Sequence, residues 1–235
     1  MTGRTLANAL RWMKDGTTVF LDAVEPDDAW LSAASRLPGW TRRHVIAHVA
    51  ANADAVGNLV HWARTGIPTP MYPSPEARAA GIEQGARRPT ADLITWLHRS
   101  AAHLASAIDG LTDEQWQRTV VTGQGRSVAA TEIPWLRSRE VYVHAVDLAA
   151  AVAFTDLPRD FLLALCHDVV AKRVSTAGPA VVLTATDVPA RWSLGTDEPV
   201  SVSGSLAAIA AYLTGRDHDL TTADGAPAPA LPPWL

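Results

Sequence analysis

The sequence predicts a mainly α-helical protein, with an N-terminal four-helix bundle in residues 1–157 and a smaller α+β domain in residues 158–235. Before residue 157, apolar side chains recur with the 3.6-residue period of amphipathic helices. After it, short runs that are rich in valine or that alternate in polarity indicate β-strands. The length of 235 residues suits one domain with a sizeable core or two small ones.

Each predicted bundle helix carries an apolar stripe or an end signal. Thr41 can cap the second helix, whose apolar stripe ends at Gly66. Thr90 can cap the third helix. Pro134 falls in the first turn of the fourth helix, where proline is tolerated. The four helices are expected at residues 5–23, 41–66, 90–109 and about 133–153.

The segment that follows the second helix contains four prolines in residues 66–75, which predicts a long and rather stiff loop. A short helix is expected after it, near residues 76–84. The C-terminal domain is predicted to hold one helix, three strands and a last helix that stops at Gly215. These elements are expected at residues 158–176, 180–185, 191–194, 200–203 and 205–214.

Composition excludes several classes of protein. Lys and Arg number 20 against 24 Asp and Glu, a net charge of −4, and no long basic run suggests a nucleic-acid partner. The single cysteine, Cys166, excludes an internal disulfide framework and a multi-thiolate metal site. No apolar run reaches the ~18 residues that a membrane span needs, and the N-terminus leads into a helical pattern rather than a signal peptide. We therefore expect a cytoplasmic monomer that does not bind membranes.

Two pairs of residues at helical spacing are candidates for metal binding. His44 and His48 lie four residues apart on the second helix, and Glu140 and His144 four apart on the fourth. Two ligands from one helix and one from a facing helix can hold a zinc ion with one position left open, as in catalytic sites. Spacing alone does not choose between His44 and His48. The alternative is a solvated Glu–His pair, although an unpaired carboxylate among the apolar neighbours of Glu140 would be costly.

Three further residues have a functional and a structural interpretation. Arg78 follows the proline-rich loop and Arg216 follows the last helix, so both could bind carboxylates bidentately. Position alone favours a surface role for Arg78 and a favourable helix-end charge for Arg216. Cys166 lies among leucines in an apolar helix, which favours a structural role over a reactive one. The run Gly123-Gln-Gly-Arg-Ser127 lacks the lysine and the strand-to-helix context of a phosphate-binding loop.

Several segments, in order along nearly the whole chain, match one family. They are residues 37–50, 58–66, 69–78, 137–148 and 202–206, the pair Gly215-Arg216 and the last four residues, Pro-Pro-Trp-Leu. On these segments the chain resembles the mycothiol-dependent maleylpyruvate isomerases of actinobacteria. The helix motifs alone indicate the wider DinB-like superfamily, whereas the loop that ends at Arg78 and the C-terminal matches are more specific to the isomerase.

The resemblance implies a DinB-like bundle with a zinc site and a C-terminal domain that helps to close the active site. By motif, it assigns the zinc ligands to His48, Glu140 and His144, and two substrate-handling arginines to Arg78 and Arg216. The implied reaction converts maleylpyruvate to fumarylpyruvate in gentisate breakdown, with mycothiol as cosubstrate. A thiolate would add to the cis double bond, the resulting single bond would rotate, and the thiolate would leave.

Two alternatives remain at this point. A mycothiol S-transferase would use the same metal and thiol on another electrophile and would accumulate a conjugate. A non-enzymatic small-molecule or anti-sigma-type binding module built on the same bundle would show neither bound zinc nor thiol-dependent turnover.

Overall fold

The computed structural model describes residues 4–173 and 177–234. The chain divides into two compact units. We call residues Thr5–Val152 the helical unit, and Arg4 together with the chain from Ala153 onward the C-terminal unit. None of the described helices combines the length and the apolar character needed to cross a membrane.

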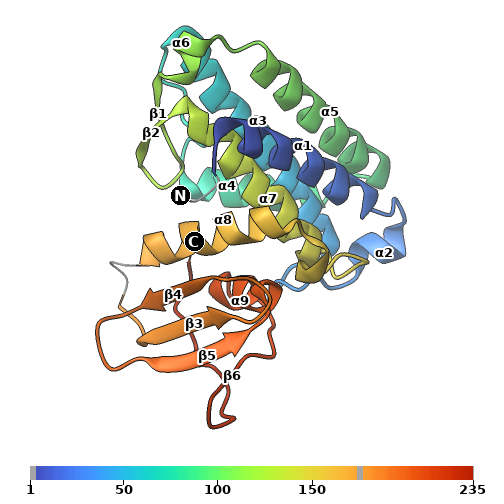
Figure 1. Ribbon diagram of the computed structural model, residues 1–235. Helices are drawn as coiled ribbons and strands as arrows, with labels where there is room; N and C mark the ends of the chain where they lie inside the picture. The colour runs from blue at the N-terminus through green and yellow to red at the C-terminus, as the bar shows by residue number, and fades with distance from the viewer. Residues whose placement is uncertain (1–3, 174–176, 235) are drawn as a thin grey trace. The chain divides into compact units, whose positions relative to one another are not determined.

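Four long helices dominate the helical unit, and α1, α3, α5 and α7 run side by side in Figure 1. Their bounds are α1 Leu6–Asp22, α3 Arg42–Thr65, α5 Thr90–Asp109 and α7 Ile133–Asp147. Shorter elements connect them: α2 Asp28–Ser32, α4 Pro75–Ala86, α6 Asp113–Trp116 and the 3₁₀ turn η1 Ala130–Glu132. The predicted bundle is thus confirmed, while α2, α6 and η1 are too short to have produced a periodic signal.

The ends of the helices follow local chemistry in most cases. Thr41 is the N-cap of α3, and α3 ends at Gly66, whose φ of 77° is left-handed and suits glycine. The expected Thr90 cap is wrong, because Pro89 occupies the N-cap position of α5. The Thr90 hydroxyl is instead engaged with Asp28 and with Arg43, which donates to it over 2.7 Å.

The fourth bundle helix is shorter than predicted. It ends at Asp147 rather than near residue 153, and Ala149 has a φ of 54° that no α-helix accommodates. Arg42 explains the stop, because its guanidinium donates to the carbonyl oxygens of Leu148 at 2.6 Å and Ala149 at 2.8 Å. A cation thus satisfies the carbonyls at the end of α7.

The core of the helical unit is built where the long helices face one another. The predicted inward residues of α5, among them Leu93, Leu97 and Leu104, are buried. At the α1–α7 contact, a Cβ atom on Gly16 would lie only 2.7 Å from Val141 Cγ2. The absence of a side chain at Gly16 therefore allows α1 and α7 to approach closely.

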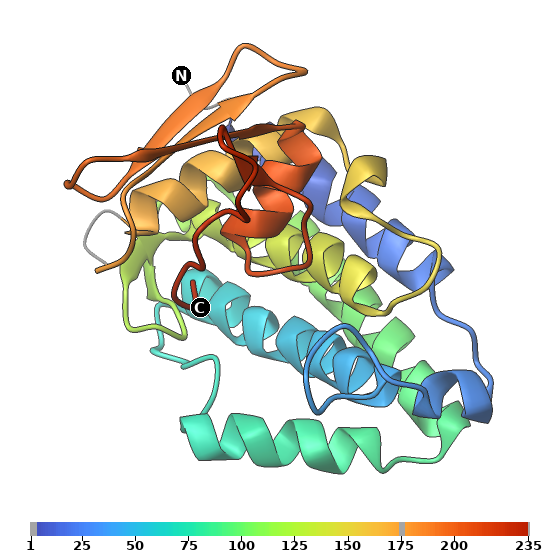
Figure 2. The ribbon, with the colours of Figure 1, turned by 90° about the horizontal axis from the view of Figure 1, so that it is seen from below.

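One hairpin and one accessory helix complete the helical unit. Strands β1 Thr119–Val121 and β2 Ser127–Ala129 pair antiparallel, so the glycine-containing run at 123–127 lies in and after a hairpin turn. A turn between two antiparallel strands is not the strand-to-helix context of a phosphate-binding loop. After the proline-rich segment, α4 packs against α3, as Figure 2 shows. The short helix expected near 76–84 is confirmed and is slightly longer.

The C-terminal unit is a four-stranded sheet with helices. Its elements are η2 Phe154–Asp156, α8 Arg159–Arg173, β3 Val181–Ala185, β4 Arg191–Leu194, β5 Val200–Gly204, α9 Leu206–Leu213 and β6 Thr221–Thr222. The strand order is β4-β3-β5-β6, with β3 and β5 parallel and the outer pairs antiparallel. The three predicted strands and both helices are confirmed. The predicted end of the first helix, at 174–176, lies outside the described residues.

Candidate active site

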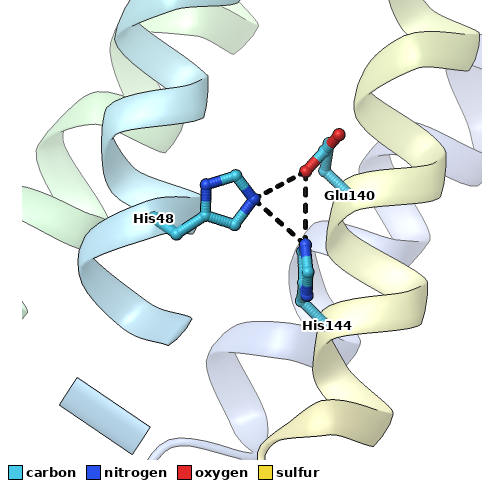
Figure 3. A group of neighbouring side chains, drawn as sticks. All are labelled: His48, Glu140 and His144. Carbon is cyan, nitrogen blue, oxygen red and sulfur yellow. Dashed lines mark hydrogen bonds and ion pairs between the residues drawn. The ribbon is translucent and has the colours of Figure 1, made fainter. Parts of the chain in front are cut away.

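Two facing helices bring a histidine, a glutamate and a second histidine to one point. Figure 3 shows His48 on α3 turned toward Glu140 and His144 on α7. His48 Nε2 lies 2.9 Å from Glu140 Oε2 and 3.0 Å from His144 Nε2, and the third side of the triangle, His144 Nε2 to Glu140 Oε2, is 3.4 Å. Spacing of four residues places Glu140 and His144 one turn apart on the same face of α7.

The geometry of this cluster fits a bound cation. Ligand atoms about 2.0–2.1 Å from a tetrahedral ion lie roughly 3.3 Å from each other. The three distances between the ligand atoms bracket that value. Two imidazole nitrogens and one carboxylate oxygen are also a donor set that zinc prefers. The residues present therefore fit a metal ion with one coordination position left open.

The second ring nitrogen of His144 has a partner of its own. His144 Nδ1 lies 2.8 Å from Oδ2 of Asp147, whose side chain is fully buried. Such a carboxylate partner fixes the tautomer and the orientation of a metal-ligating imidazole. Sequence reasoning missed Asp147, although its position three residues after His144 on a helix was a usable signal.

The charges of the cluster are strongly coupled. Burial would raise the pKa of Glu140, but hydrogen bonds with His144 and His48 outweigh it and hold the pKa well below the usual range. For His144, burial acts to lower the pKa, but the hydrogen bonds to Asp147 and Glu140 raise it overall. Burial lowers the pKa of His48 despite its hydrogen bond to Glu140. At neutral pH, the cluster therefore holds a charged carboxylate and a neutral His48.

His44 lies outside this cluster and has structural partners. Its Nδ1 accepts a hydrogen bond from the backbone N–H of Thr41 over 3.1 Å, which closes the first turn of α3. Its Nε2 lies 3.5 Å from Glu83, and its ring stacks on Trp40 at 6.1 Å. Of the two histidines that spacing left open, His48 is the one that lies beside Glu140 and His144.

Arg78 lies beside the cluster. It is in the first turns of α4, and its Nη2 is 3.5 Å from His48 Nδ1. Its guanidinium carbon is 5.8 Å from the ring centre of Tyr72, a residue of the proline-rich loop. The structure therefore brings Arg78 together with the three candidate ligands.

Two buried polar residues next to the cluster were also missed. Asn52 lies one turn after His48 on α3, and its Oδ1 accepts a hydrogen bond of 2.9 Å from Arg137 Nη1. Arg137 also donates to the carbonyl oxygen of Val49 over 2.8 Å. Burial lowers the Arg137 pKa to about 10, and the negative charge of Glu140 acts against this. The positions of Asn52 and Arg137, four after His48 and three before Glu140, were the available signals.

Arg216 and Cys166 belong to the C-terminal unit. Arg216 lines a cavity of about 340 Å³ together with Tyr212 and His218. Cys166 is fully buried, and burial raises its pKa to about 12. His167, its neighbour in sequence, instead accepts a hydrogen bond from Trp192 Nε1 over 3.1 Å. The burial of Cys166 agrees with the structural role expected for it.

The bundle, its His–Glu–His cluster and the α+β unit define a mainly α-helical protein with a candidate metal site in its helical unit. Residues 6–149 match the family model described as the mycothiol maleylpyruvate isomerase N-terminal domain. The crystal structure of the mycothiol-dependent maleylpyruvate isomerase is 40% identical to this chain, with 98% of each chain covered and a TM-score of 0.92. A histidine-to-alanine mutant of that enzyme gives the same values. No curated protein sequence matches the chain. The chain belongs to the mycothiol-dependent maleylpyruvate isomerase family.

Proposed function

We propose that this protein isomerises maleylpyruvate to fumarylpyruvate, a step of gentisate breakdown, with mycothiol as cosubstrate and zinc as its metal. The observation that carries the proposal is the convergence of three ligand atoms within 4.8 Å in a chain of this family. His48, Glu140 and His144 would hold the zinc ion. A zinc ion supplies Lewis acidity, which lowers the pKa of a thiol bound to it or polarises a bound oxygen.

The chain's own chemistry supports a borrowed nucleophile. Cys166 is the only cysteine of the sequence, and a buried thiol with a pKa of about 12 provides almost no thiolate at neutral pH. The sulfur that adds to the double bond must therefore come from a small molecule. Addition forms a carbon–sulfur bond and moves the π electrons onto the conjugated carbonyl oxygen. Rotation and reversal then break the same bond and return the thiolate, so the thiol is not consumed.

Arg78 is suited to hold the anionic substrate at the cluster. Its guanidinium reaches His48 and carries five donors in a fork that matches a carboxylate. It would bind one carboxylate and stabilise the negative charge that develops on addition. We propose Arg216, which lines its own cavity in the C-terminal unit, as the second substrate-handling arginine.

An assay of purified, desalted protein with maleylpyruvate, with and without mycothiol, tests the proposal. We expect isomerisation that requires the thiol, returns it unchanged and stops when the metal is chelated. Accumulation of a thiol conjugate would show a transferase instead, and no turnover together with no bound metal would show a binding protein.

Matched arginine variants test the substrate contacts. Arg78→Ala should reduce kcat/KM at least tenfold, because a hydrogen bond to a charged group is worth ~1.5–3 kcal/mol. Arg87→Ala on the same helix is the control, since the Arg87 side chain is 79% exposed and its Nη2 lies 3.8 Å from Glu83 Oε2. Arg216→Ala should show a similar loss, with the exposed Arg191 as its control. Unchanged kinetics in Arg78→Ala or in Arg216→Ala would remove that residue from the mechanism.

A further inference from the structure

Arg137 carries a positive charge into the interior of the helical unit, where it is only 1% exposed. Burial lowers its pKa to about 10, so the guanidinium remains charged at neutral pH. The part of the chain that the structure describes places no carboxylate in an ion pair with it, and its Nε has no hydrogen-bond partner. A buried charge without a carboxylate partner is costly, so its presence calls for an explanation.

The hydrogen bonds of Arg137 differ from those of two other arginines that bind backbone carbonyls. Arg42 donates to carbonyl oxygens just after the end of α7, and Arg173 donates to that of Leu213, the last residue of α9. Such carbonyls lack a partner within their own helix. Arg137 instead donates to Val49 inside α3, where the helix already supplies a donor. Closing a helix end therefore does not explain Arg137.

Arg137 and Asn52 join α3 and α7 next to the cluster drawn in Figure 3. Asn52 lies four residues after His48, and Arg137 lies three residues before Glu140. The Asn52–Arg137 contact is therefore one turn away from the His48–Glu140 contact on both helices. One turn is a rise of about 5 Å, and residues at this spacing share a face of the helix. The charge of Arg137 accordingly interacts with that of Glu140.

Arg137 balances the charges around the candidate metal site. Glu140 and Asp147 carry negative charges in the cluster or in contact with it. Arg78, beside His48, and Arg137 carry positive ones. These charges cancel, so the site with zinc bound would present the full charge of the divalent ion to a ligand. Without Arg137, the same site would present one positive charge fewer.

We propose that Arg137 is a specificity-determining residue, whose buried positive charge favours a ligand with two negative charges over a ligand with one. The inference rests on the proposed function, because the substrate proposed there is a dicarboxylate. Arg78 would contact the ligand directly, whereas Arg137 acts through the electric field of its charge. Solvent and salt screen an interior charge less than an exposed one, so the field of the enclosed guanidinium reaches a ligand at the cluster.

Asn52→Asp tests the charge without removing Arg137. The new carboxylate would keep the shape of the amide and the hydrogen bond of 2.9 Å from Arg137. Its negative charge would cancel the positive charge beside it. The ligands are maleate at pH 8, where both of its carboxyl groups are ionised, and isocrotonate, in which a methyl group replaces one carboxylate. Isothermal titration calorimetry of zinc-loaded protein measures both affinities and needs no turnover.

We expect Asn52→Asp to bind maleate roughly tenfold more weakly than the wild type does. Isocrotonate should lose only about threefold, because the electrostatic free energy is proportional to the charge of the ligand. Zinc content should match the wild type, and the thermal unfolding midpoint should be equal or higher, since the hydrogen bond becomes charge-assisted on both sides. Arg137→Lys, which keeps the charge, should retain the wild-type preference for maleate.

Gln84→Glu is the matched control, because it makes the same change from amide to carboxylate at an exposed position of α4. It should bind both ligands as the wild type does, since solvent screens an exposed charge. A folded, zinc-loaded Asn52→Asp with wild-type affinity for maleate would overturn the role of Arg137. Equal losses for maleate and isocrotonate, or the same loss in Gln84→Glu, would overturn it too.

Two further outcomes would contradict a role of the charge. One is loss of the zinc or of the fold in Asn52→Asp, which would show that the amide is required for the structure. The other is a folded Arg137→Lys that no longer prefers maleate. A wild type that prefers maleate but does not isomerise maleylpyruvate would overturn the proposed function alone. A wild type that binds no maleate would overturn both proposals.

Discussion

His144 directs one ring nitrogen at the cluster and the other at Asp147, whose side chain is fully buried and lies 2.8 Å from the His144 Nδ1. A carboxylate in this position keeps the proton on Nδ1 and the lone pair on Nε2, where a metal ion would bind. The pair also raises the pKa of His144 against the effect of burial. Asp147 thus acts on the candidate metal site through His144.

Asp147→Asn should weaken zinc binding. We expect a loss of about 10- to 100-fold in affinity, the range typical for partners of metal-ligating histidines. A competition titration with a chromogenic chelator measures it, and Asp109→Asn, at the exposed end of α5, is the control. Wild-type affinity in a folded Asp147→Asn protein would contradict this function of the pair.

The ligand assignment predicts a sharp contrast between two neighbouring histidines. His48→Ala should reduce bound zinc from about one per chain to nearly none, because a three-ligand site depends on every ligand. His44→Ala should retain the metal but lose ~0.5–2 kcal/mol of stability, since the imidazole closes the first turn of α3. Metal analysis and thermal unfolding of both variants check this, and the opposite pattern would overturn the assignment.

Metal affinity should fall in acid. A metal ion must displace the proton from His144, whose pKa is raised, whereas His48 and Glu140 have lowered pKa values and are already deprotonated at neutral pH. Affinity should therefore decline as the pH falls through the raised pKa of His144 and level off above it. Zinc titrations between pH 5.5 and 8.5 would show the decline. Asp147→Asn should shift it to lower pH, because the main hydrogen bond that raises the pKa is weakened.

Cys166 should take no part in the reaction. Native protein should resist thiol-specific reagents, because the thiol is fully buried and has a pKa of about 12, and should react once unfolded. Cys166→Ala should keep most of the thiol-dependent activity, since Ala is a small residue that the apolar helix accepts. A folded, metal-loaded Cys166→Ala without activity would mean that the nucleophile is not borrowed.

Two helical glycines should respond in opposite ways to the same substitution. Gly16→Ala would place a Cβ 2.7 Å from Val141 Cγ2, and the overpacking of α1 against α7 should exceed the ~1 kcal/mol gained in helix propensity. Gly57→Ala on α3 meets nothing within 4 Å and should be neutral or stabilising. Denaturant unfolding measures both, and we expect the two variants to differ by about 1–3 kcal/mol. Equal effects would contradict the close helix contact.

Much of the helical unit was predictable because its signals are local. Gly66 ends α3 as expected, and the apolar stripe of α5 faces the core. The end of α7 was not predictable, because Arg42, more than a hundred residues away in sequence, binds the last carbonyls. The predicted Thr90 cap was wrong for a similar reason, because the Thr90 hydroxyl accepts a hydrogen bond from Arg43 on another helix.

The candidate site was predictable only in part. Helical spacing indicates that Glu140 and His144 share a face, but it treats His44 and His48 alike. Only the three-dimensional structure shows that His44 is engaged by the start of its own helix. Tyr72 lies in a loop beside Arg78, and no period or spacing in a loop predicts where a side chain lies.

The two helices that meet at the cluster are far apart in the chain, since His48 is separated from Glu140 by 92 positions and from His144 by 96. An ion bound there would connect the two helices as a cross-link does. A cross-link that closes a loop of that length stabilises the folded state by roughly 4–5 kcal/mol, because it reduces the entropy of the unfolded chain. This stabilisation of the folded state is comparable to the free energy of unfolding that one or two damaging core substitutions would remove. The protein would then tolerate more core substitutions when the cell supplies the metal than when metal is scarce.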